Sequence, residues 1–258
     1  MGEFQPPVRE DLRGLTPYGA PQLDVDVRLN VNENPFAPSP ELARALGASV
    51  TDVARTLNRY PDRECRALRQ ALADYLSQES SAECGVESIW VANGSNEVMS
   101  HIMAAFGGPG RAALSFPPTY SMYPEYARES FTTMVSVPRT ADFGIDMAAS
   151  MAAISGHRPS VVLLASPNNP TGTAVSADDI AVLARATADT GGMLVVDEAY
   201  AEFRRPGQPS SVASLANHPN MIVTRTMSKA FAMAGARVGY AAAHPSVIDA
   251  LRVVRLPY

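Results

Sequence analysis

The sequence predicts an α/β fold in which a mostly parallel sheet is flanked by helices. Runs at residues 161–165, 193–196 and 221–224 have the length of strands and are apolar at nearly every position. Strands with this pattern are buried on both faces, as they are in parallel sheets. From about residue 62 onward, such runs alternate with segments of helical periodicity, which is typical of layered α/β domains.

The individual elements follow from periodicity and turn residues. One amphipathic helix is predicted by apolar side chains at positions i, i+3, i+4, i+7 and i+8, namely Leu68, Ala71, Leu72, Tyr75 and Leu76. Ser176 and Asp179 resemble a capping box that opens a helix. The remaining expected elements are strands at 89–92, 112–115, 132–137 and 239–243, and helices at 96–106, 122–129, 176–188 and 246–254.

Composition excludes several classes of protein. With 258 residues, 46% of them hydrophobic, the chain can build a substantial core. A net charge of −5 without any Lys/Arg run argues against nucleic acid as a partner. Cys65, Cys84 and four scattered histidines predict neither a disulfide framework nor a metal site. Without an apolar leader or an 18-residue apolar run, we expect no membrane association and a cytoplasmic location.

A carboxylate follows one of the buried strands. Asp197 comes directly after the run at 193–196, at the sheet edge where ligands of open α/β sheets bind. A buried carboxylate must meet a cation or be strongly hydrogen-bonded. Two partners fit, the protonated ring nitrogen of a cofactor or an Arg in an ion pair. Tyr200, three residues further on, is placed to donate to an oxygen of such a ring.

Two other polar segments follow strands. The Gly-Ser-Asn sequence at 94–96 begins a predicted helix, so it is either a simple cap or a phosphate site on the helix N-terminus. The Asn-Asn-Pro-Thr-Gly sequence at 168–172 is typical of a turn when taken alone. The strand at 221–224 leads to Lys229, whose amine condenses readily with an aldehyde when desolvated. Arg237 offers a planar fork for phosphate oxygens.

These segments together resemble a known family. Asn-Pro-Thr-Gly at 169–172, Asp197 with Tyr200, Ser228-Lys229, and Arg237 eight residues later are similar to the class I/II branch of fold-type I pyridoxal-phosphate aminotransferases. Within that branch, the segments at 15–18, 32–35, 58–62, 117–123 and 225–232 resemble the histidinol-phosphate aminotransferases. The resemblance runs from about residue 12 to residue 258.

The resemblance implies a role for each matching residue. Lys229 would be the Schiff-base lysine, Asp197 the partner of the pyridinium nitrogen, and Tyr120 the side chain stacked on the ring, and these three are the expected catalytic residues. Asn169 and Tyr200 would hydrogen-bond the ring oxygen. The residues expected around the phosphate of pyridoxal 5'-phosphate are Ser95, Asn96, Thr226, Ser228 and Arg237, joined by Tyr60 from the neighbouring subunit of a homodimer. Tyr18 and Asn32 would lie near the substrate.

The expected activity is transamination between an amino donor and a 2-oxo acid, with histidinol phosphate and 2-oxoglutarate as the implied pair. Alternatives are an aromatic-amino-acid aminotransferase on the same scaffold and a cofactor-binding fragment without turnover. The family continues into a C-terminal segment with arginines for the substrate's anionic group, and this sequence ends before it. We therefore expect residues 1–60 to form an N-terminal arm and part of a small domain, and residues 61–258 to form the cofactor-binding large domain.

Overall fold

The computed structural model describes residues 4 and 6–256, which divide into two units. The first unit, Met1–Glu33, holds the 3-10 helix η1 (Glu10–Leu12) and no other helix or strand among its described residues. The second unit, Asn34–Tyr258, holds the sheet and the α-helices. Pro257 and Tyr258, at the end of the predicted large domain, lie outside the described residues.

Seven strands of the second unit form one sheet in the order β1-β7-β6-β5-β4-β2-β3. Their bounds are β1 (Ile89–Asn93), β2 (Ala112–Ser115), β3 (Thr133–Ser136), β4 (Val161–Ala165), β5 (Met193–Asp197), β6 (Met221–Thr226) and β7 (Val238–Ala243). All pairs from β3 across to β6 are parallel, whereas β7 is antiparallel to both of its neighbours. The predicted mostly parallel sheet is confirmed, and each predicted strand lies within two residues of its expected bounds.

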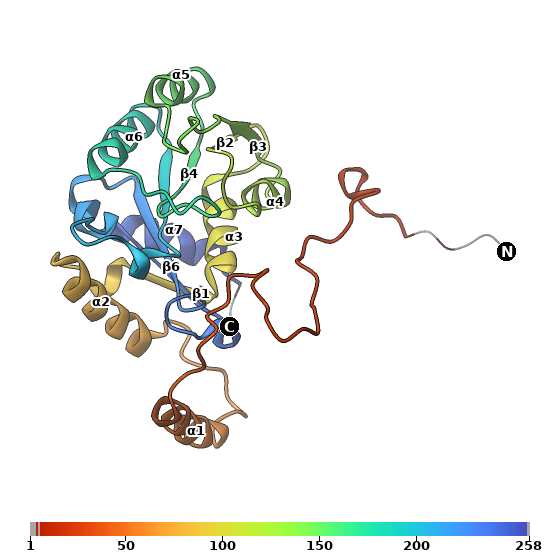
Figure 1. Cartoon of the computed structure of the whole chain (residues 1–258), viewed down its shortest axis with the longest axis vertical. Helices are drawn as coiled ribbons and strands as arrows, with labels where there is room; N and C mark the ends of the chain where they lie inside the picture. The colour runs from red at the N-terminus through yellow and green to blue at the C-terminus, as the bar shows by residue number, and fades with distance from the viewer. Residues whose placement is uncertain (1–3, 5, 257–258) are drawn as a thin grey trace. The chain divides into compact units, whose positions relative to one another are not determined.

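Helices cover both faces of this sheet (Figure 1). One core cluster unites apolar residues of α3 (Ser95–Phe106), α4 (Tyr123–Glu129) and α7 (Pro245–Val254) with the sheet. Two further clusters on the opposite face involve α2 (Arg66–Ser80), α5 (Met147–His157) and α6 (Ala177–Asp189). Strand β4 serves both faces, since its residues 161, 163 and 165 belong to the first cluster and 162 and 164 to the second.

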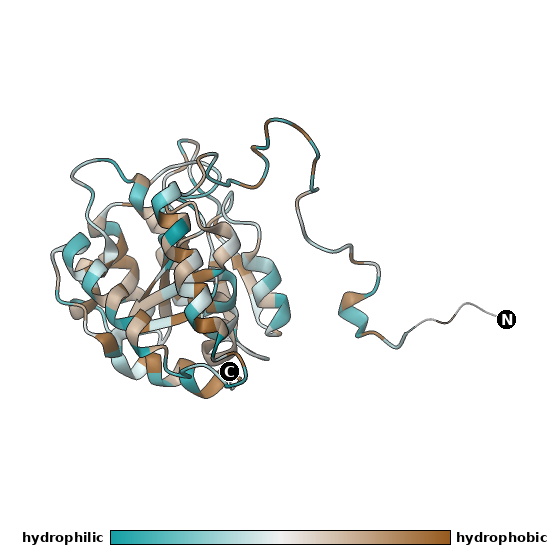
Figure 2. Cartoon of the chain, turned by 90° about the horizontal axis from the view of Figure 1, so that it is seen from below, coloured by the Kyte–Doolittle hydropathy of each residue, from teal (hydrophilic) through white to brown (hydrophobic). Residues whose placement is uncertain are grey.

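Hydropathy follows this layering, with apolar positions in the strands between the helical layers (Figure 2). The short 3-10 helices of the second unit are η2 (Val86–Ser88), η3 (Ala201–Phe203), η4 (Ser211–Asn217) and η5 (Ala234–Ala236). Within the described part of the chain, no helix is both long enough and apolar enough to cross a bilayer.

Two helices were not predicted from the sequence. Helix α5 is rich in Ala and Met around its whole circumference, so its sequence lacks a polar face and shows no helical period. Helix α1 (Pro40–Ala54) lies in the Pro-rich N-terminal segment, where Ser39 caps it by accepting a hydrogen bond from the Leu42 N–H. The predicted cap of α6 is confirmed, because the Asp179 N–H donates to Ser176 Oγ at 3.0 Å.

Candidate active site

Apart from Tyr60, the predicted site residues of the second unit belong to segments that meet at one edge of the sheet. Strands β1, β4, β5 and β6 end at this edge, whereas the antiparallel β7 begins there. Asn93 at the end of β1 pairs with Val238 at the start of β7. Arg237, which precedes a strand in the sequence, is therefore brought to the same edge as Gly94, which follows one.

Asp197 is the last residue of β5 and is 6% exposed. Its Oδ2 accepts a hydrogen bond from Tyr123 Oη at 2.9 Å, and its Oδ1 accepts from the Ala199 N–H at 3.2 Å and from Thr224 Oγ1 at 3.3 Å. Burial raises the pKa of this carboxyl, while the three donors act to lower it. Among the described residues Asp197 forms no ion pair, so the Arg alternative from the sequence is not what the structure contains.

The segment that begins α3 meets Arg237. Gly94 has φ +86°, and a Cβ on it would lie 2.4 Å from Arg237 Nη2. Gly239 of β7 lies so close that its Cβ would be 2.2 Å from the Ser95 amide nitrogen. Arg237 also donates to Ser228 Oγ at 3.4 Å. The two glycines thus let a helix N-terminus, a guanidinium and a hydroxyl converge, which is the donor set that a phosphate group requires.

Lys229 lies in the loop after β6, beside Tyr200. Its Nζ is 5.9 Å from the centroid of the Tyr200 ring. Two side chains hydrogen-bond to the backbone of this loop. Asn34 Nδ2 donates to the Ala230 carbonyl at 3.2 Å, and Thr226 Oγ1 accepts from the Ser228 N–H at 3.1 Å. Thr226 is 3% exposed, so its hydroxyl supports the backbone of this loop.

Tyr120 and Asn96 lie close together at the same edge, since Tyr120 Oη donates to Asn96 Oδ1 at 3.4 Å. Asn96 Oδ1 also accepts from Tyr126 Oη of α4 at 2.9 Å. The Tyr120 ring meets the Tyr123 ring edge-on, with centroids 5.6 Å apart. Tyr123 and Tyr126 were missed by the sequence analysis, although their three-residue spacing from Tyr120 was a signal that could have found them.

Asn168 is a further residue to which the sequence assigned no role of its own. It is 2% exposed and joins the loop after β2 to the loop after β4. Its Oδ1 accepts from Thr119 Oγ1 at 2.8 Å, and its Nδ2 donates to the Pro118 carbonyl at 3.0 Å and to Thr171 Oγ1 at 2.8 Å. The loops that carry Tyr120 and Asn169 are therefore fixed relative to each other.

A buried ionic cluster supports the ends of β5 and β6. Arg225 is 1% exposed and lies four residues before Lys229. Its guanidinium donates to Glu198 at 2.8 Å, to Glu202 at 2.9 Å and to Glu79 of α2 at 3.1 Å. Glu198 follows Asp197 directly. The cluster therefore joins the end of β5, which carries Asp197, to the end of β6, which leads into the Lys229 loop. Arg225 was not predicted as part of the site, because an Arg beside a strand is usually exposed.

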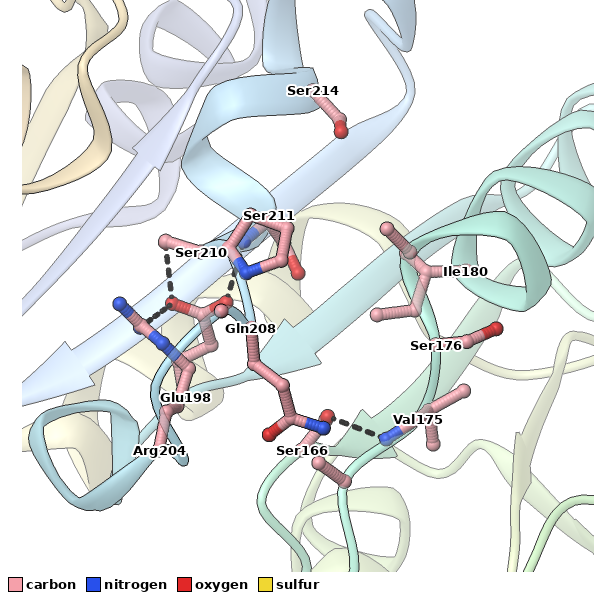
Figure 3. Close-up of a pocket in the computed structure, with 14 residues that line it drawn as sticks. Ser166, Val175, Ser176, Ile180, Glu198, Arg204, Gln208, Ser210, Ser211 and Ser214 are labelled. Carbon is pink, nitrogen blue, oxygen red and sulfur yellow. Dashed lines mark hydrogen bonds and ion pairs between the residues drawn. The ribbon is translucent and has the colours of Figure 1, made fainter.

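A cavity of about 240 Å³ lies next to this cluster (Figure 3). On its polar wall Glu198 accepts from Ser210 Oγ at 2.8 Å and from the Ser211 N–H at 2.7 Å, whereas Nε and Nη1 of Arg204 have no hydrogen-bond partner among the described residues. On the other side, Ser166 Oγ accepts from the Val175 N–H at 3.0 Å. None of the predicted site residues lines this cavity.

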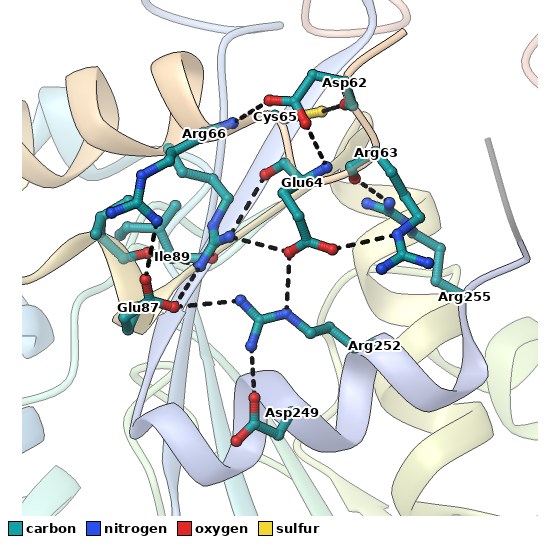
Figure 4. Close-up of polar contacts among 12 residues, drawn as sticks. Asp62, Arg63, Glu64, Cys65, Arg66, Glu87, Ile89, Asp249, Arg252 and Arg255 are labelled. Atoms are coloured by element: carbon teal, nitrogen blue, oxygen red, sulfur yellow. Dashed lines mark hydrogen bonds and ion pairs between the residues drawn. The ribbon is translucent and has the colours of Figure 1, made fainter. Parts of the chain in front are cut away.

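Tyr60 is 77% exposed and precedes a segment held by ion pairs. Figure 4 shows this network around Glu64, Glu87 and Arg252. Arg69 belongs to the same network, is 3% exposed and donates to the Ile89 carbonyl at 2.9 Å. Glu64 pairs with both Arg69 and Arg252 of α7, at 3.4 and 3.2 Å. Tyr18 and Asn32 belong to the first unit. The roles of these three residues stay predictions.

The class of this protein follows from its match to a family model. The family model for aminotransferase class I and II matches residues 25–258, and the chain belongs to this family. Within it, the sequence is 59% identical to the histidinol-phosphate aminotransferase of Thermobifida fusca over 252 residues, which is 98% of this chain and 67% of that protein. It is 55% identical to the histidinol-phosphate aminotransferase of Bifidobacterium longum, with 98% of this chain and 68% of that protein covered.

Solved structures are similar as well. The histidinol-phosphate aminotransferase of Sinorhizobium meliloti in complex with pyridoxal-5'-phosphate superposes with a TM-score of 0.76 at 28% identity, over 87% of this chain and 58% of that one. The aspartate aminotransferase of Thermus thermophilus with maleate gives a TM-score of 0.77 at 26% identity, over 88% and 59% of the two chains. The chain thus spans between about three fifths and two thirds of the length of these relatives.

Proposed function

We propose that the chain binds pyridoxal 5'-phosphate and catalyses transamination between histidinol phosphate and 2-oxoglutarate. The observation that carries the proposal is the convergence of a lysine, a buried carboxylate and a phosphate cradle at one sheet edge. The names of the relatives favour histidinol phosphate over an aromatic amino acid as the amino donor.

The residues present fit the cofactor. A buried carboxylate held by three neutral donors is the group that a pyridinium nitrogen needs as its partner. Gly94 lets the Arg237 guanidinium pack against the turn, and Gly239 lets β7 pack against the Gly94–Ser95 backbone, since a Cβ at either position would clash. Ser95 and Asn96 backbone amides, Ser228 and Arg237 would hold the phosphate, while Tyr120, Asn169 and Tyr200 would contact the ring. Thr226 would act through the backbone of the Lys229 loop.

When bound, pyridoxal phosphate supplies an aldehyde that condenses with amines and a ring that withdraws electrons from the substrate. Lys229 Nζ would hold the cofactor and would serve as the base for the proton on the substrate carbon that bears the nitrogen. Asp197 would keep the ring nitrogen protonated. Tyr120 would stack on the ring.

The experiment is cofactor binding followed by substrate comparison. Addition of pyridoxal phosphate to the wild-type chain should give a visible absorbance band that borohydride reduction fixes covalently at Lys229, as peptide mass spectrometry can locate. Lys229→Ala should lose the band and the adduct. Identical spectra for both proteins would rule out the cofactor role of Lys229.

Turnover distinguishes the remaining candidates. Histidinol phosphate should react faster than phenylalanine when 2-oxoglutarate is the acceptor. Faster reaction of phenylalanine would favour the aromatic-amino-acid activity. Covalent cofactor binding without reaction of either donor would identify the chain as a cofactor-binding fragment.

We further propose a cytoplasmic homodimer in which Tyr60 reaches the cofactor phosphate of the neighbouring subunit. The high exposure of Tyr60 supports a role outside its own subunit. We also propose that residues 1–60 comprise an arm and part of a small domain, with Tyr18 and Asn32 near the substrate. Helix α1 supports this division, because it has no buried residue and displays an apolar stripe of Leu42, Leu46, Val50 and Val53.

A further inference from the structure

Three tyrosines at three-residue spacing connect separate parts of the site. Tyr120 precedes α4, while Tyr123 and Tyr126 belong to its first turns and are 0% and 2% exposed. Tyr123 donates to Asp197 at 2.9 Å, and Tyr126 donates to Asn96 at 2.9 Å. The Tyr120 ring packs edge-on against Tyr123 at 90°. One short segment thereby contacts both Asp197 at the end of β5 and Asn96 in the first turn of α3.

We propose that Tyr123 and Tyr126 are positioning residues, which hold the Asp197 carboxylate and the Asn96 side chain in register for the two ends of one cofactor molecule. This inference rests on the proposed function, since it assigns new residues to the same site. It also gives the Asn96 side chain a role, as the acceptor that anchors the first turn of α3 to α4.

Tyr123 suits Asp197 because its phenol stays protonated near neutral pH and so remains a hydrogen-bond donor. Burial, and then the neighbouring carboxylate, raise the pKa of Tyr123 well above its usual value, so the phenol keeps its hydrogen and donates it. Burial raises the pKa of the Asp197 carboxyl, and the hydrogen bond from Tyr123 lowers it again in part. With Oδ1 fixed by Ala199 and Thr224, the bond from Tyr123 to Oδ2 sets the plane of the carboxylate.

Tyr126 acts at the opposite end of the pocket. Asn96 Oδ1 accepts from both Tyr126 and Tyr120, at 2.9 and 3.4 Å, which fixes the second residue of α3. The backbone amides of this turn are the groups that would meet a phosphate. Loss of the Tyr126 hydroxyl should therefore disturb the phosphate while leaving Asp197 unchanged.

The chain offers a matched control in Tyr240. This tyrosine is 0% exposed like Tyr123, yet its hydroxyl has no hydrogen-bond partner among the described residues. Tyr240→Phe removes the same atom from an equally buried ring without breaking a hydrogen bond. A purely structural effect of losing a buried hydroxyl should therefore appear in Tyr240→Phe as well.

The test compares Tyr123→Phe, Tyr126→Phe and Tyr240→Phe by cofactor binding and NMR. For Tyr123→Phe we expect covalent attachment at Lys229 to persist, the Kd for pyridoxal phosphate to rise about 10-fold or more, and the ¹⁵N resonance of the ring nitrogen to move toward its unprotonated position. For Tyr126→Phe the ³¹P resonance should move and the ¹⁵N resonance should not. Tyr240→Phe should match the wild type in both.

A double-mutant cycle shows whether Tyr123 acts through Asp197. In an Asp197→Asn background, Tyr123→Phe should change the Kd by less than about twofold.

A second substitution covers the case in which Tyr123→Phe fails to fold. 3-Fluorotyrosine at position 123 keeps the ring and the hydroxyl, and because its hydroxyl is a stronger donor, the ¹⁵N resonance should move in the opposite direction. Wild-type Kd and ¹⁵N position in the folded Tyr123→Phe protein, or an unmoved resonance in the fluorotyrosine protein, would overturn the inference.

These outcomes are separate from failure of the proposed function. If the wild-type chain forms no covalent adduct at Lys229, the proposed function fails before any tyrosine variant is compared. If it forms the adduct and the three Phe variants behave alike, the proposed function stands and the positioning role is wrong.

Discussion

At the scale of single residues, burial decides which ionisable groups differ from their ordinary chemistry. Asp197 and Cys84 are both buried, but only Asp197 has donors that favour its charged form. Cys84 lies in an apolar cluster, and burial raises the pKa of its thiol to about 11. The expectation of two free thiols agrees with the structure, in which Cys65 and Cys84 are unpaired with each other.

The two cysteines should differ in reactivity. At pH 8 a thiol reagent should label Cys65 in the folded protein, whereas Cys84 should react only after denaturant is added, because its thiolate is scarce and inaccessible.

The Cys84 thiol also makes stability depend on pH. Its pKa is higher in the folded than in the unfolded protein, so it contributes stability below about pH 9 that is lost as pH rises toward 11. Cys84→Ala should remove that part of the pH dependence, and equal labelling of both thiols would contradict the assignment.

At the scale of secondary-structure elements, the site depends on strand ends that are held together by buried polar groups. Arg225 joins β6 to Glu198 after β5 and to Glu79 of α2. Removal of one member of a buried ion pair leaves the other charge uncompensated, which costs more than the loss of an exposed pair.

Substitution of Arg225 should show this difference. Arg225→Met should lower the free energy of unfolding in urea by about 3–5 kcal/mol, because Glu198 is 2% exposed and would lose its closest cation. Arg66→Met is the control, since its ion pair with Glu87 has side chains 69% and 53% exposed, and the change should be below about 1 kcal/mol. Equal effects of the two substitutions would contradict the prediction that burial of Glu198 makes the loss of Arg225 more costly.

The β1 to α3 turn gives a second prediction at this scale. Gly94→Ala should weaken pyridoxal phosphate binding about 10-fold or more, because a Cβ at φ +86° is strained and displaces Arg237. Gly85→Ala is the control, since its added Cβ meets nothing within 4 Å. The Kd from absorbance titration is the measurement, and an unchanged Kd in Gly94→Ala would show that Arg237 does not hold the phosphate.

At the scale of the whole molecule, the proposed homodimer predicts that subunits complement each other. In a mixed dimer of Tyr60→Phe and Lys229→Ala chains, one site receives Lys229 from the first chain and Tyr60 from the second, and the other site lacks both. Random mixing makes half of the dimers mixed, so about one quarter of all sites should regain wild-type cofactor affinity. If Tyr60 acted within its own subunit, mixing would restore none.

The sequence by itself determined the layered α/β fold, because successive apolar residues at 161–165, 193–196 and 221–224 have no stable place except between two layers of helices. It also predicted that Ser95, Asn169 and Asp197 belong to one site with Lys229, since each of them ends or follows a strand at an edge where ligands of open α/β sheets bind. Helix α5 was not predictable, because an Ala-rich segment carries no hydropathy period.

The tertiary structure alone decided how those residues are supported. Tyr123 and Asp197 are 74 residues apart in sequence, and Arg225 and Glu79 are 146 apart. Such pairs leave no local pattern in a single chain, because they form only after strands from distant segments align. The antiparallel direction of β7, which brings Arg237 to Gly94, likewise depends on strand pairing, and pairing is settled by the packing of the whole sheet.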